Sequence, residues 1–288
     1  MRFTPAISLL LLYLGLAGPA AAESSVWKVQ NDSQVIYLGG TVHLLRASDF
    51  PLPQEYDIAY ENSSELVFET DLESMNDLAV QARLMQQLSY GSDKSLKTVL
   101  NDEAYSALEM YTASMGLPLP MLEKFRPGMI ISTLQVLEFQ KIGFTPMGVD
   151  AHFNSMAIND GKPVGQLETI DAQIGFLASM GEGNESEFIL LSLKDLADTA
   201  NVMDEMIAAW RNGNNDGLSE LFVNDMLEEA PEVYDSLLKQ RNLNWMPQLE
   251  AMLLSEPTEF VLVGAAHLVG PDGLLALLEA KGYEVSQL

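Results

Sequence analysis

The sequence contains no cysteine, and it has only 15 lysine and arginine residues against 41 aspartate and glutamate residues. The missing cysteine excludes disulfide bonds, thiolate metal sites and a cysteine nucleophile. The shortage of cations leaves a formal net charge of −26. Because such a surface repels phosphate backbones and anionic lipid, we expect no nucleic-acid partner. We interpret the acidity of this protein as a solubilising coat rather than as an acidic binding face.

Long apolar runs are also lacking, except at the start of the chain. Arg2 precedes the apolar run Ile7–Leu16, and the small residues Ala20–Ala22 follow it. This pattern is typical of a signal peptide, which we assign to residues 1–22 with cleavage after Ala22. No cysteine follows for a lipid anchor, and no second long apolar run follows. We therefore expect a periplasmic or secreted protein without a membrane anchor, and a single mature domain over residues 23–288.

Strand patterns lie at the two ends of the mature chain, and the middle is mostly helical. A hairpin is predicted over 26–38, and the apolar runs at 65–69 and 259–263 are typical of buried strands. A short strand is expected at 163–167 and a last one at 283–285. Between about 75 and 245 the periodicity predicts mainly helices. The pattern favours a mixed α/β fold with a central sheet built from both ends of the chain and a large helical insertion.

Two of the three histidines stand in the same setting. His43 ends the run Val35–His43, and His267 ends the run Phe260–His267. Each run is an apolar strand followed by a Gly-x-x-His motif, whose last residue is the histidine. Ligands in α/β sheets bind beyond the carboxyl ends of the strands, where Glu69 also follows a strand. Two imidazoles and a carboxylate are a common ligand set for a catalytic divalent metal. The alternative is that each histidine only caps its strand and bonds a backbone carbonyl, but the repetition favours a site.

Three further residues are candidates with open alternatives. Glu168 stands at an expected strand-to-helix junction, where it could be a ligand, a general base or a helix-end acid. Arg241 could stabilise an oxyanion, hold Glu69 or Glu168, or form a surface ion pair. His152 is interpreted as a packing or capping histidine, with Asp150 as the N-cap of its helix. The sequence has no His-Glu-x-x-His, Gly-x-Ser-x-Gly, P-loop or Rossmann glycine pattern.

These motifs, taken in order, resemble the TraB/GumN (TraB/PrgY/GumN) family, which includes the TIKI-type Wnt-cleaving proteases. The matching stretches run from about residue 26 to the C-terminus: Gly40–His43, Glu65–Glu69, Gly148–Phe153, Gly161–Val164, Leu167–Thr169, Arg241–Asn242 and Gly264–Gly270. The resemblance implies a fold like that of erythromycin esterases and ChaN-like haem-binding proteins. It also implies a metal-dependent hydrolase that uses the two Gly-x-x-His histidines and acidic residues, with manganese or cobalt as the metal of the proteolytic members.

Three hypotheses for the function follow. The first is an exported metal-dependent hydrolase, most simply a peptidase. Its metal ligands would be His43, His267 and Glu69, its catalytic residues Glu69, Glu168 and Arg241, and its metal Mn²⁺, Co²⁺ or Zn²⁺. Its substrate would be a peptide or a small amide or ester. The second is a non-enzymatic binder that sequesters a peptide signal or haem in the same cleft. The third is an ester hydrolase that uses a histidine as base without a metal.

The signal-peptide assignment predicts the first residue of the exported protein. N-terminal sequencing of that protein should begin at Glu23, because the small residues Ala20–Ala22 present the cleavage site. A mature protein that retains Met1 would contradict the assignment.

Overall fold

The computed structural model describes residues 23–31 and 34–288, the side chains of residues 197–201 excepted. The expected signal peptide lies outside the described residues. Six strands form one sheet in the order β4-β3-β5-β2-β1-β6. The strands are β1 (Val26–Asn31), β2 (Gln34–Thr41), β3 (Glu65–Phe68), β4 (Val164–Gln166), β5 (Glu259–Gly264) and β6 (Glu284–Gln287). The sheet therefore joins both ends of the described chain, and the fold is a mixed α/β fold as the sequence predicts.

Four neighbouring strands of this sheet run parallel. β5 pairs in parallel with both β2 and β3, and β4 pairs in parallel with β3, whereas β1 is antiparallel to β2 and β6. Every residue of β5 before Gly264 is buried, as expected for an interior parallel strand covered on both faces. The carboxyl ends of β2, β3, β4 and β5 consequently meet at one edge of the sheet.

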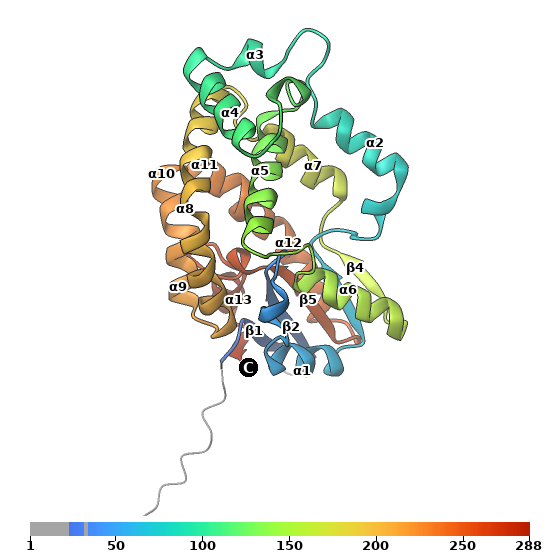
Figure 1. Ribbon diagram of the computed structural model, residues 1–288. Coiled ribbons are helices and arrows are strands. Elements are labelled where there is room, and N and C mark those ends of the chain that lie inside the picture. Colours follow the sequence, from blue (N-terminus) through green and yellow to red (C-terminus); the bar gives the residue numbers. More distant parts are fainter. Residues whose placement is uncertain (1–22, 32–33) are drawn as a thin grey trace, which may run out of the picture.

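Most of the helices lie in the insertion between β3 and β5. Figure 1 shows them extending away from the sheet, with α3 and α4 farthest from the strands. The helix bounds are α1 (Gln54–Asn62), α2 (Leu78–Gln87), α3 (Leu96–Val99), α4 (Asp102–Ser114), α5 (Pro127–Lys141), α6 (Val149–Asp160), α7 (Ile170–Ser179), α8 (Glu185–Arg211), α9 (Asn215–Ser219), α10 (Asp225–Glu229), α11 (Pro231–Tyr234), α12 (Gln240–Met252) and α13 (Leu274–Ala280).

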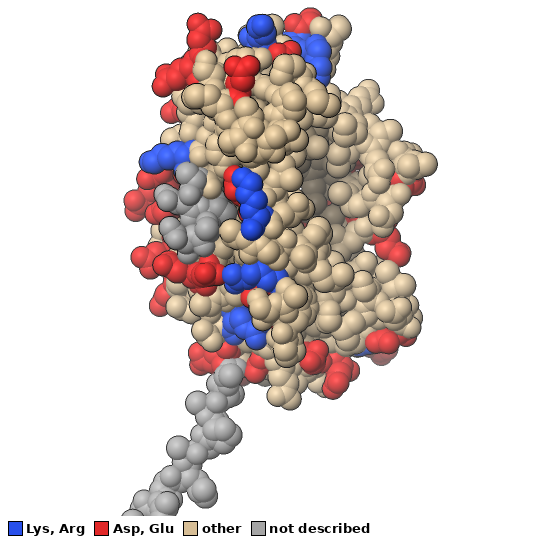
Figure 2. Space-filling model, in the orientation of Figure 1, with Lys and Arg blue, Asp and Glu red and all other residues tan. Residues whose placement is uncertain are grey.

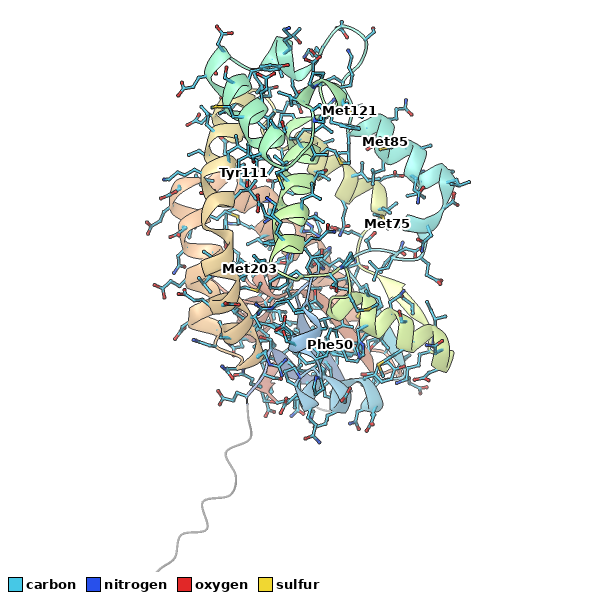
Figure 3. All side chains as sticks on the ribbon, viewed as in Figure 1. Phe50, Met75, Met85, Tyr111, Met121 and Met203 are labelled. Atoms are coloured by element: carbon cyan, nitrogen blue, oxygen red, sulfur yellow. The ribbon has the colours of Figure 1, made fainter. Side chains whose placement is uncertain are left out.

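The long helix α8 connects two apolar cores. Its first half contributes Ile189 and Leu193 to a cluster among α3, α4 and α5, against which Tyr111 packs. Its second half contributes Met203 and Trp210 to the larger cluster around the sheet. In Figure 3, Met203 lies toward the sheet and Tyr111 toward the far helices. Each large side chain that is fully buried contributes about 1.5 to 3 kcal/mol, so α8 ties the insertion to the sheet.

The end of β2 is held by a buried polar contact. The indole Nε1 of Trp210 donates to the carbonyl of Gly40 at 2.7 Å, and the hydroxyl of Tyr56 donates to the same carbonyl. All three groups are inaccessible to solvent, so these hydrogen bonds satisfy groups that would be costly to leave unpaired. The network fixes the backbone just before His43.

The surface matches the composition. Figure 2 shows acidic side chains spread along the margins of one face rather than gathered into one patch, and a hollow lined mostly by uncharged residues opens on that face. Among the described residues, no helix combines the length and the apolar character needed to cross a bilayer.

The sequence predicts most elements, but several short helices were not expected. These are α1, α3, α9 and α10. In addition, the chain from Pro231 to Met252 contains a π-helical turn at Asp235–Lys239, between α11 and α12. Such turns change the direction of the side chains that follow, and here Arg241 follows directly.

A pair of glycine substitutions tests how closely α6 approaches β2. A Cβ atom at Gly148 would lie 2.3 Å from the carbonyl group of His43, whereas a Cβ at Gly175 in α7 would meet nothing within 4 Å. Gly148→Ala should therefore lower the free energy of unfolding by about 1 to 3 kcal/mol. Gly175→Ala should raise it by about 0.5 to 1 kcal/mol, because alanine stabilises a helix interior. Urea denaturation measures both, and equal effects of the same sign would contradict the close approach.

Candidate active site

Three strand ends face one point at the carboxyl edge of the sheet. His43 follows β2, Glu69 follows β3, and His267 ends the short 3-10 turn Ala265–His267 after β5. The amide of Gly264 donates to Oε1 of Glu69 at 2.7 Å. From the position that a Cβ atom would take at Gly264, Glu69 Oε1 is 3.2 Å away, His267 Cδ2 3.6 Å and His43 Nε2 4.0 Å. The structure thus brings both Gly-x-x-His histidines and Glu69 together.

His43 lies at the open side of this cluster. Its side chain is 65% exposed, and its Nδ1 lies 2.8 Å from Oδ2 of Asp150, a residue near the start of α6. Because a carboxylate can only accept, the proton is on Nδ1 and Nε2 faces the site. The charge of Asp150 raises the pKa of His43 to about 9, against the opposing effect of desolvation. His43 is therefore protonated at neutral pH in the metal-free protein.

His267 is the buried counterpart, with only 5% of its side chain exposed. The amide nitrogen of Asn242 donates to the backbone carbonyls of His267 (3.0 Å) and Asp272 (2.8 Å), which turns its oxygen toward Nδ1 of His267 at 2.7 Å. The proton therefore sits on Nδ1, and Nε2 carries the lone pair. Burial lowers the pKa of His267 to about 4, so the ring is neutral at physiological pH.

Arg241 links the acidic residues of the site. From the start of α12, its Nη2 donates to Glu69 Oε2 at 2.5 Å and to Glu168 Oε1 at 2.7 Å. Its Nε donates to Glu168 Oε2 at 3.2 Å, and its Nη1 lies 3.0 Å from Nε2 of His267. The guanidinium carbon lies 4.8 Å from the ring centre of Trp245. Burial alone would lower the pKa of Arg241, but the two carboxylates hold it above its usual value.

Glu69 is held as an anion by its surroundings. Burial alone would raise its pKa, but His267, Arg241, His43 and the Gly264 amide outweigh burial and hold the pKa of Glu69 at about 2. The amide of Gln173, in α7, also donates to its Oε2 at 3.2 Å. Both oxygens of the carboxylate are therefore oriented by fixed donors.

Comparisons with known proteins agree with the order of these motifs. The sequence model of the TraB/PrgY/gumN family matches residues 25–287. The chain belongs to this family. It is 28% identical over 251 residues to the uncharacterized protein YbaP of Escherichia coli, covering 84% of this chain and 87% of that protein, and equally similar to YbaP of Shigella flexneri. No solved structure gives a significant match.

The structure brings all of the expected site residues into the cluster. Five further groups that were not expected at the site also contact it. The motif histidines, Glu69, Glu168 and Arg241 all contact the cluster, and Arg241 holds both glutamates rather than one. The sequence pattern did not indicate Asn242, Trp245, Gln173 or the Gly264 amide as contacts of the site. The N-cap role considered for Asp150 was wrong: the N-cap of α6 is Gly148, and the Asp150 carboxylate binds His43 instead. No local pattern signals this contact, because the two residues are 107 positions apart in the sequence.

His152 is outside this cluster. Its ring lies 5.5 Å from that of Phe50 and 5.1 Å from that of Phe153, and burial lowers its pKa. It packs against aromatic side chains, as the sequence analysis interpreted it, and so provides a histidine for comparison.

The donor set fits a divalent metal in its chemistry, but binding requires His43 to lose a proton and Arg241 to move. Histidines that bind metals usually donate their other ring N–H to a carboxylate or carbonyl, and both His43 and His267 do so with Nε2 left toward the site. However, no three of the described His, Asp and Glu side chains are already spaced to hold an ion. Arg241 Nη1 occupies the lone pair of His267, so metal binding at Nε2 requires Arg241 to release it.

The pairing of His43 with Asp150 predicts a pH dependence of stability. The pKa of His43 is about 9 in the folded protein, against 6.5 for a free histidine such as that of the unfolded chain. The pair therefore stabilises the fold fully below pH 6.5 and loses this contribution as the pH rises through 9. Asp150→Asn should lower the pKa of His43 and remove the loss of stability between pH 6.5 and pH 9. Histidine NMR titrations, with His152 as internal reference, measure the pKa of His43. Urea unfolding at pH 6 and 9.5 measures the loss of stability. An unchanged His43 titration would contradict the assignment.

Proposed function

We propose that the protein is an exported metal-dependent hydrolase whose reaction takes place between His43, Glu69 and His267. The observation that supports this most strongly is the shared orientation of the two histidines. Each has Nδ1 fixed by an oxygen acceptor and Nε2 toward Glu69. A structural histidine that only caps a strand has no need for this arrangement, whereas a metal ligand does.

His43, His267 and Glu69 are the proposed metal ligands. Glu69 suits a ligand better than a general base, because a carboxylate with a pKa of about 2 is a weak proton acceptor at neutral pH. Mn²⁺, Co²⁺ and Zn²⁺ all accept this mixed nitrogen and oxygen set. When bound, the ion would polarise the scissile carbonyl and lower the pKa of water.

The remaining residues have complementary proposed roles. Glu168, which lies across Arg241 from Glu69, is the nearby carboxylate left to accept a proton. Once Arg241 releases His267, its Nη1 is free to donate to an oxyanion of the substrate. Trp245 donates to Glu168 Oε2 at 3.3 Å and keeps this carboxylate oriented.

The choice of a peptide bond rests on the resemblance of the motifs to those of proteolytic TIKI-type relatives. Export rests on the pattern of residues 1–22. The binding protein for a peptide signal or haem and the metal-free ester hydrolase remain the alternatives that the following experiment distinguishes.

Metal binding is the first test of this proposal. Isothermal titration with Zn²⁺, Mn²⁺ and Co²⁺ should show one site, and His43→Ala and His267→Ala should each weaken binding at least tenfold. His152→Gln is the matched control and should bind metal as the wild type does. Because His43 is protonated before the metal binds, binding at pH 7.5 should release about one proton. The released proton makes the measured binding enthalpy depend on the ionisation enthalpy of the buffer.

Peptide hydrolysis should follow the metal. It should stop with chelator, return with one of the three ions, and be lost in either histidine variant. Full ligand binding by metal-free protein, unchanged in both variants, would overturn the hydrolase and favour a binding protein. Hydrolysis that persists in chelator but requires His43 would favour the metal-free esterase.

A further inference from the structure

The outer edge of the sheet beside the site carries free backbone groups. β4 is the last strand on this side, and all three of its residues are exposed. Figure 1 shows it at the outer margin of the sheet. Within the described part of the chain, no strand pairs with its outer side.

The hydrogen-bond register shows which backbone groups face outward. Leu66 donates to the carbonyl of Pro163 at 3.0 Å, and Leu167 donates to that of Phe68 at 2.9 Å. In a parallel pair, alternate residues of a strand bond to the same neighbour. Positions 163, 165 and 167 therefore face β3, and the N–H and C=O groups of Val164 and Gln166 point away from the sheet.

No charged side chain of β4 protects this edge, and the strand is three residues long. Exposed edges are commonly blocked by charged side chains, particularly lysine, but the sequence of β4 is Val-Gly-Gln. The preceding lysine, Lys162, is turned inward to the carbonyls of Tyr60 and Ser63. Gly165 presents no side chain, and the nearest atoms to a Cβ there would belong to β3: a methyl group of Val67 at 3.5 Å and the carbonyl oxygen of Leu66 at 3.9 Å. Nothing in these residues hinders another extended chain from pairing here.

The edge is continuous with the active site. Two residues after Gln166, the amide of Glu168 donates to the carbonyl of Glu69 at 2.9 Å, and the Glu168 side chain binds Arg241. A chain paired with β4 would leave the strand beside Glu168 and could cross the carboxyl ends of β3 and β5 toward His43. Neighbouring strands are about 4.8 Å apart, so a few extended residues cover this path.

We propose that β4 is the docking edge for an extended polypeptide substrate, which pairs with Val164 and Gln166 as an additional strand. This inference rests on the proposed hydrolase function and specifies its substrate class: an unfolded segment recognised through its backbone. Recognition of this kind gives affinity from main-chain hydrogen bonds and limited dependence on side chains.

A proline substitution separates this role from a structural one. Gln166→Pro removes an outward N–H but no hydrogen bond to β3, and edge strands tolerate proline. With unstructured ten-residue fluorogenic peptides, it should raise KM about five- to tenfold with little change in kcat. Gln166→Ala also removes the side chain but keeps the N–H, so the difference in KM between the two variants measures the backbone hydrogen bond alone. Equal KM values for the two variants would overturn the proposal.

Hydrogen exchange gives a readout that does not require activity or a variant. Saturating peptide should slow amide exchange at Val164 and Gln166 in the metal-free wild-type protein. Protection in the metal-free protein, combined with no cleavage after Zn²⁺, Mn²⁺ or Co²⁺ is added, would support docking while overturning the hydrolase. Cleavage without protection would overturn docking and leave the hydrolase, and the absence of both would overturn both.

Discussion

The site depends on one buried guanidinium. Arg241 bonds to Glu69 after β3, to Glu168 after β4 and to His267 after β5, so a single side chain from α12 joins the ends of three neighbouring strands. Two carboxylates this close would repel each other, and burying them without a cation would be costly. The arginine lies between them and offsets this repulsion. Its Nη1 also contacts Nε2 of His267, so it must move before that nitrogen can bind another group. Arg241 therefore both holds the cluster together and blocks His267 as a ligand.

The two histidines have the same motif but different electrostatic states. Asp150 keeps His43 protonated at the open side, whereas burial beside Asn242 keeps His267 neutral. The difference arises from the chemistry of the acceptor on Nδ1: a carboxylate stabilises the imidazolium, and an amide oxygen fixes the tautomer without adding charge. A metal ion at the site would replace the proton of His43 and meet a ready neutral ligand in His267. The same pair without a metal is a proton donor beside a neutral acceptor.

The sequence predicts the strand-borne half of the site better than the helix-borne half. Gly-x-x-His after an apolar strand is a local pattern, and strand ends converge wherever parallel strands are neighbours. The contacts of His43 with Asp150 and of Glu69 with Gln173 span more than 100 residues. No periodicity encodes them, since they depend on where α6 and α7 pack against the sheet. The short helices α9 and α10 were missed for a related reason: five-residue helices are stabilised by packing rather than by their own pattern.

The helical insertion is therefore part of the site and not an addition to it. α6 supplies Asp150, α7 supplies Gln173, and α12 supplies Arg241, Asn242 and Trp245, while the sheet supplies the histidines and Glu69. The acidic composition acts on this cluster at longer range. An excess of carboxylates attracts divalent cations and disfavours anionic substrates, and the same field favours the protonated form of the exposed His43. Under the proposed function, a metal ion approaching the site would be drawn by the surface but would have to displace both a proton from His43 and the Arg241 contact from His267. Its occupancy would then depend on the local competition at these two nitrogens, which the surface charge can shift but cannot replace.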